Sequence, residues 1–204
     1  MPRPTRERVT ATKIDQRRDA LLDRLVEVIL VDGFAEASIE ELAAKLRCSK
    51  STLYSLADTK ERIIVAGVRR FFQRAAARVD ARLLRIDGTP LERIRTYLVA
   101  IATELAPASP AFFADLDSWP TTQQIYRDNT RIASERVREL VREASPAASG
   151  AQATFVGAVA AQVMEGIHRG EIETATGLDD SAAYRALADL IVQGLDTPTP
   201  EGNA

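Results

Sequence analysis

A short run of polar side chains carries the most evident chemistry in this 204-residue sequence: Ser49-Lys50-Ser51-Thr52, followed by Tyr54. These residues concentrate hydroxyl and amine donors within about one and a half turns of a helix. Such donors can bond to phosphate oxygens and to the edges of bases, and the free amides at a helix start also favour an anion. This chemistry indicates binding to nucleic acid rather than catalysis.

The residues needed for catalysis or for metal binding are scarce. The chain has one cysteine, Cys48, and one histidine, His168, which excludes an intramolecular disulfide and a multi-cysteine metal site. No glycine-rich loop that would cradle a phosphate is present. A metal at His168 would need carboxylates such as Glu165 or Glu171, and a histidine in the last turn of a helix is more often a cap. We therefore expect no enzyme activity, no metal and no cofactor.

The elements that must position the polar run are two short helices. Ser38 and Glu41 have the spacing of a capping box, which predicts a helix over residues 38–46. Ser49 can cap a second helix that ends near Leu56, and only Arg47-Cys48 separates the two. These are the proportions of a helix-turn-helix, whose second helix enters the major groove of DNA. On spacing alone, a plain helical hairpin remains an alternative.

Residues 18–65 resemble the DNA-binding domain of the TetR (tetracycline repressor) family of bacterial transcriptional regulators. The resemblance is carried by Gly33-Phe34, Ser38-Ile39-Glu40-Glu41-Leu42-Ala43, Ser49-Lys50-Ser51-Thr52-Leu53-Tyr54 and Lys60-Glu61. It implies that residues 49–54 form the recognition helix and that Lys60 holds the DNA backbone. The family often has two aromatic residues where this chain has Leu56 and Ala57, which puts its usual phosphate contact in doubt.

The basic residues are concentrated at the N-terminus. The net charge is −2, but residues 1–74 hold 15 basic and 11 acidic residues and residues 75–204 hold 12 and 18. Residues 1–18 alone hold six basic residues against two acidic ones. We expect residues 1–17 to be a flexible basic arm, either a solvated tail or a segment that follows phosphates or a minor groove. The candidate DNA contacts are Arg6, Arg8, Ser38, Arg47, Ser49, Lys50, Ser51, Thr52, Tyr54 and Lys60.

The rest of the chain has the period of helices and lacks strand-like alternation. The predicted fold is all-α with about nine helices: a helix-turn-helix domain over residues 18–58, a ligand-binding and dimerisation domain over 59–196, and a disordered tail over 197–204. Further helices are expected near 15–30, 59–86, 91–106, 107–120, 121–144, 152–169 and 181–195. No apolar run is long enough for a membrane span, and we expect a soluble, cytoplasmic protein.

The second domain contains most of the aromatic residues, which suits a small-molecule site as well as ordinary core packing. Asn129 and Arg136 interrupt the apolar stripe of their helix and are candidate polar contacts. The candidate ligand residues are Tyr97, Phe112, Phe113, Trp119, Tyr126, Asn129, Arg136, Phe155 and Met164.

Residues 152–169 are apolar nearly all round, which predicts burial on more than one face. Together with residues 181–195 they could form a four-helix bundle across a two-fold axis, in agreement with the homodimer that the resemblance implies. The leading hypothesis is a dimeric regulator, acting as a repressor, that a small-molecule effector releases from a palindromic DNA operator. The alternative is a helical dimeric interaction or ligand-binding protein that does not use DNA.

Overall fold

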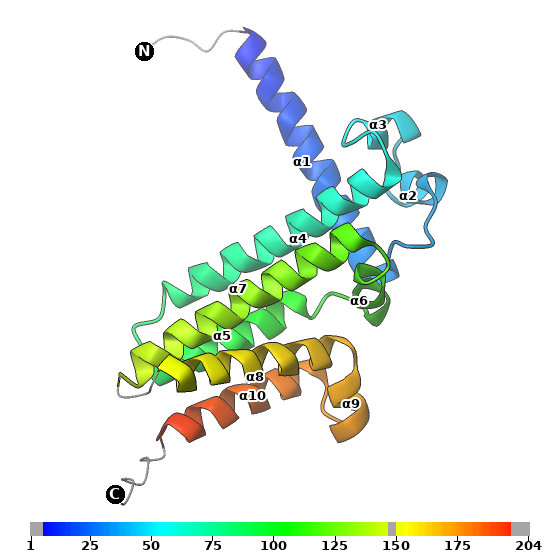
Figure 1. Ribbon diagram of the computed structural model, residues 1–204. Helices are drawn as coiled ribbons and strands as arrows, with labels where there is room; N and C mark the ends of the chain where they lie inside the picture. Colours follow the sequence, from blue (N-terminus) through cyan, green and yellow to red (C-terminus); the bar gives the residue numbers. More distant parts are fainter. Residues whose placement is uncertain (1–5, 147–149, 197–204) are drawn as a thin grey trace, which may run out of the picture.

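The computed structural model describes residues 6–146 and 150–196, which form ten helices and no strand (Figure 1). The helices are α1 (Arg6–Asp32), α2 (Ile39–Lys45), α3 (Lys50–Tyr54), α4 (Lys60–Leu83), α5 (Pro90–Leu105), α6 (Pro110–Leu116), α7 (Pro120–Ala144), α8 (Gly150–His168), α9 (Glu171–Thr176) and α10 (Asp180–Asp196). The all-α prediction is confirmed. The sequence did not predict α9, which lies between Gly170 and Gly177, whose left-handed backbones set it off from its neighbours. The tail expected over residues 197–204 lies outside the described residues.

Helix α1 begins earlier than predicted. Its backbone is helical from Arg6, so most of the segment expected as a flexible arm is part of this helix. Residues 6–17 contain no glycine or proline. A helix that is already nucleated by packing extends at little cost through such residues. The segment expected as an irregular arm is therefore helical from Arg6 onward.

Helix α4 joins two hydrophobic clusters. Its first half buries Ile63, Ile64 and Val68 in a cluster with residues of α1, α2 and α3, and its second half buries Val79 and Leu83 in a second cluster with residues of α5, α7 and α10. Figure 1 shows α2 and α3 at one end of α4, whereas α8 and α10 lie at a distance from them. The first cluster also contains Phe112 of α6 and Tyr126 of α7, so the core does not divide at residue 58, the expected domain boundary.

Among the described residues, no single helix is long and apolar enough to cross a membrane. Helices α5 and α6 reach the necessary length and apolar character only when they are taken together across a bend of 95°.

Candidate nucleic-acid interface and ligand cavity

Helix α3 owes its position to its caps and to one buried residue. The Ser49 hydroxyl accepts a hydrogen bond from the Thr52 backbone N–H at 3.1 Å, which starts the helix. Leu53 is fully buried and fixes the helix to the first hydrophobic cluster. Arg47 adopts the left-handed backbone, with φ at 50°, that turns the chain between α2 and α3. The predicted helix-turn-helix geometry is therefore present.

The other face of α3 is exposed. Ser49, Lys50, Ser51, Thr52 and Tyr54 all point to solvent, and Tyr54 is 45% exposed, which is high for an aromatic residue. Lys50 pairs with the exposed carboxylate of Glu40 on α2. An exposed ion pair of this kind is weak and can exchange for a phosphate.

Several predicted DNA contacts have structural roles in the free protein. The Ser38 hydroxyl accepts from the Glu41 backbone N–H at 3.2 Å, and the Ser38 backbone N–H donates to the Glu41 carboxylate at 2.7 Å, which completes the predicted capping box. The Lys60 amine donates to the Ala35 carbonyl at 2.8 Å and lies 5.6 Å from the centre of the Trp119 ring. Lys60 therefore needs no phosphate to explain its place in the first turn of α4. The side chains of Arg6 and Arg8 lie outside the part of the chain that the structure describes.

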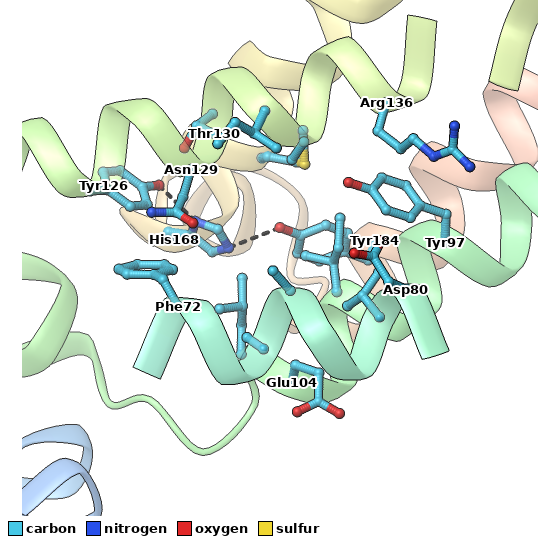
Figure 2. A pocket seen from close by; sticks show the side chains of 18 residues that line it. Phe72, Asp80, Tyr97, Glu104, Tyr126, Asn129, Thr130, Arg136, His168 and Tyr184 are labelled. Carbon is cyan, nitrogen blue, oxygen red and sulfur yellow. Dashed lines mark hydrogen bonds between the residues drawn. The ribbon is translucent and has the colours of Figure 1, made fainter. Parts of the chain in front are cut away.

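A cavity of about 180 Å³ lies between α4, α5, α7, α8 and α10 (Figure 2). Five of the predicted ligand residues line it: Tyr97, Tyr126, Asn129, Arg136 and Met164. Sequence reasoning missed other lining residues, among them Phe72, Asp80, Glu104, His168 and Tyr184. Tyr184 is an aromatic residue of the second domain, on a helix that was expected to serve only the dimer, so an aromatic count over that helix could have found it.

The other predicted ligand residues lie elsewhere. Phe112 is fully buried, with its ring edge-on to Phe34 and Phe71. Trp119 packs on Phe34, with 5.2 Å between ring centres, and Phe155 is 68% exposed on α8. Phe113 lies on the other side of His168 and does not line this cavity. Aromatic residues serve core, surface and cavity alike, and their helix positions do not distinguish these roles.

His168 is a wall of the cavity rather than a helix cap. Its Nδ1 lies 2.7 Å from the Tyr126 hydroxyl and its Nε2 lies 2.9 Å from the Tyr184 hydroxyl. Burial lowers the pKa of His168 from 6.5 to about 4, so the ring is neutral at physiological pH. Burial also raises the pKa values of Tyr97, Tyr126 and Tyr184, which keeps their hydroxyls protonated.

No protein-family model and no curated protein matches this sequence. Solved structures do match. A TetR-family regulator from Cytophaga hutchinsonii aligns over 92% of this chain and 98% of its own, with a TM-score of 0.71 and 14% identity. A transcriptional regulator from Saccharomonospora viridis in complex with choline aligns over 87% and 96%, with a TM-score of 0.70 and 17% identity. AibR, in complex with isovaleryl coenzyme A and operator DNA, aligns over 85% and 97%, with a TM-score of 0.60 and 17% identity.

The chain has the TetR fold. Within this fold, Leu56 is buried in the first cluster, where it supplies packing that the family often assigns to an aromatic residue. The Leu56 carbonyl also accepts a hydrogen bond from the Arg18 guanidinium at 2.9 Å, which ties α1 to the segment after α3. The departure from the TetR pattern at this position therefore leaves the helix-turn-helix packed.

Helix α6 connects the two halves of the TetR fold. The Ser109 backbone N–H, just before α6, donates to the Leu30 carbonyl at 2.8 Å. The Asp115 carboxylate accepts from the Phe34 and Ala35 backbone N–H groups, the second at 2.9 Å. On the other side, Phe113 stacks on His168. This short helix thus contacts both the cavity wall and the turn that leads into α2.

Proposed function

We propose that this protein is a DNA-binding transcriptional regulator of the TetR family whose DNA affinity responds to a small molecule in the cavity. The observation that carries the proposal is the exposed face of α3, where a capped helix presents Lys50, Ser51, Thr52 and Tyr54 with no core role. The AibR neighbour, which holds both a small molecule and operator DNA, supports the same pairing of functions. The action proposed is repression, released by the effector.

The proposed DNA-binding form is a homodimer built from α8 and α10. Phe155 on α8 and Leu190 on α10 are 68% and 65% exposed, although both are large and apolar. Ala158 and Ala186 are exposed on the same two helices. Large exposed apolar residues on two neighbouring helices are typical of a protein–protein interface.

Not all of the small residues on α8 are available for a dimer interface, because Gly157 packs against α7 of the same chain. A Cβ on Gly157 would lie 3.0 Å from the Ser134 carbonyl oxygen, so this glycine lets α7 approach α8 within the chain. Only the outward face of α8 is left for a second copy.

The proposed response runs from the cavity through α4 and α6. Phe72 and Val79 of α4 line the cavity, and the same helix carries Ile63 and Ile64 in the core beneath α3. A ligand that moves either helix would change the spacing of the two α3 helices in a dimer and so select a state that no longer fits DNA.

A hydroxyl-radical footprint on the DNA upstream of the protein's own gene tests this proposal. The expected pattern is two protected patches separated by about one turn of DNA, about 34 Å, because a two-fold dimer presents two recognition helices. An effector that releases the protein from DNA should remove both patches together. No protected patch on any tested regulatory DNA would favour a ligand-binding protein that does not use DNA.

A further inference from the structure

Tyr126, His168 and Tyr184 form one wall of the cavity. The direction of the hydrogen bonds between them depends on which nitrogen of His168 carries the proton, and a ligand can change that choice. A neutral imidazole has one N–H donor and one nitrogen acceptor. One tyrosine must therefore donate its proton to the ring, while the other accepts from the ring and keeps its own proton for another partner. Figure 2 shows the two tyrosine hydroxyls on opposite sides of His168, each joined to one ring nitrogen.

The two tautomers of His168 differ in where the remaining proton goes. When Nδ1 carries the proton, Tyr126 accepts from it and can donate to the Thr130 hydroxyl, which lies one turn further along α7 and also lines the cavity. Tyr184 then donates to Nε2, so all three groups are satisfied within the protein. When Nε2 carries the proton, Tyr126 donates to Nδ1 and the Tyr184 O–H is left without an acceptor among the described side chains. Tyr184 lines the cavity, so a ligand oxygen there can supply that acceptor.

The Tyr97 hydroxyl adds a second donor. Tyr97 is 5% exposed, no hydrogen bond to its hydroxyl is found among the described residues, and the hydroxyl points into the cavity (Figure 2). The hydroxyl is open to the cavity, so a ligand oxygen there can accept a hydrogen bond from it.

The charged groups of the cavity are already neutralised or lie at its rim. Arg136 is shared between two carboxylates, Glu139 at 2.8 Å and Glu143 at 3.9 Å, unlike Lys50 with its single partner, and Glu104 pairs with Arg78 at 2.7 Å. Asp80 is exposed. A buried anion would find no free cation beside the hydroxyl wall in the described part of the chain, and a buried cation would find only these neutral hydroxyls and ring faces. Transfer of a charge from water into such a site is costly.

The volume gives the size of the part of a ligand that the cavity can enclose. An apolar protein cavity of about 150 Å³ holds benzene, so about 180 Å³ suits a ring or short chain with a few additional atoms. We propose that the cavity binds a small uncharged molecule with an apolar body and a carbonyl oxygen that accepts a hydrogen bond from Tyr184, and that binding shifts His168 to the tautomer with the proton on Nε2. This inference rests on the proposed function, in which this cavity is the effector site.

Calorimetric titration of the full chain with four compounds of matched size tests the ligand class: acetophenone, benzoate, 1-phenylethylammonium and ethylbenzene. We expect acetophenone to bind at least about tenfold more tightly than each of the other three, a ratio that corresponds to one net hydrogen bond or a desolvated charge. The Tyr184→Phe variant should lose most of the preference for acetophenone over ethylbenzene, whereas the control Thr174→Val, which removes an exposed hydroxyl on α9, should leave the ranking unchanged. If benzoate or 1-phenylethylammonium binds the natural protein as tightly as acetophenone or more tightly, the inference is overturned, whatever the variant does.

The tautomer has its own readout, because His168 is the chain's single histidine. In ¹⁵N NMR of histidine-labelled protein, the ring nitrogens should report the Nδ1–H form in the free protein and a shift toward the Nε2–H form on saturation with acetophenone. An unchanged tautomer at saturation would refute the proposed shift of the His168 proton from Nδ1 to Nε2. Neither experiment contains DNA, so a protein that passes both and still fails to bind any operator would refute the proposed function and leave the ligand class standing.

Discussion

The ring of Phe113 lies flat on the imidazole of His168, with 4.6 Å between ring centres and 6° between ring planes. This stack joins α6 to the wall of the cavity. Two residues further along, Asp115 holds the turn between α1 and α2. A displacement of His168 can therefore reach the helix-turn-helix through the contacts of α6, in addition to any path through α4.

The Asp115 carboxylate is expected to make a main contribution to this route. The Asp115→Asn substitution keeps the shape but replaces the carboxylate oxygen Oδ2, which accepts from both backbone N–H groups, by a neutral and weaker amide acceptor. The free energy of unfolding should decrease by about 1–3 kcal/mol in urea denaturation. The control is Asp117→Asn at the end of the same helix, which is exposed and should change stability little. Equal effects of the two substitutions would show that Asp115 does not hold the turn.

Gly33 lies in the same turn, and a substitution there tests how closely α6 approaches the turn. Its φ is 75°, and a Cβ there would lie 2.5 Å from Asp115 Oδ2. Gly170 has a similar φ of 71°, but a Cβ added to it would meet nothing within 4 Å. Both alanine substitutions incur the left-handed cost of about 1–2 kcal/mol, and Gly33→Ala should lose about 1–3 kcal/mol more because of the clash. Thermal unfolding of the pair measures the difference, and equal losses would mean that the turn relaxes freely.

The buried imidazole predicts a pH dependence of stability. The pKa of His168 is about 4 in the folded protein, against 6.5 for a histidine that is not buried. Between these values the unfolded chain binds a proton that the folded protein does not, so stability is present above pH 6.5 and is lost as pH falls toward 4. The expected slope is about 1.4 kcal/mol per pH unit at its steepest. Urea denaturation of His168→Gln should show a shallower slope over this range than the natural protein, and parallel curves would contradict the prediction.

The proposed dimer face predicts a difference between two exposed leucines. Leu190→Glu places a charge on α10 at the face shared with Phe155 and should convert a dimer to a monomer in light scattering at micromolar concentration. Leu84→Glu, at the end of α4, changes a residue that is 88% exposed and should leave the dimer intact. A natural protein that is monomeric would contradict the proposed dimer, and a Leu190→Glu variant that stays dimeric would place the interface elsewhere.

Local signals predicted the fold well wherever a cap or a period fixes a helix. Ser38 and Ser49 set the starts of α2 and α3 within one residue, because side-chain capping acts over three or four positions. The cavity could be predicted only in part, since which helices lie side by side depends on packing between distant segments. His168 and Tyr126 are 42 residues apart in the sequence, and no local pattern near His168 predicts their hydrogen bond.

The binding of DNA by the exposed face of α3 is tested most directly by fluorescence anisotropy with labelled upstream DNA over a series of salt concentrations. We predict specific binding that weakens steeply with salt. In the Lys50→Ala/Tyr54→Ala double variant, that binding should be lost with thermal stability unchanged, and the charge-matched control Arg185→Ala on α10 should bind as the natural protein does. Full affinity in the double variant would contradict the assignment of α3 as the DNA-binding helix.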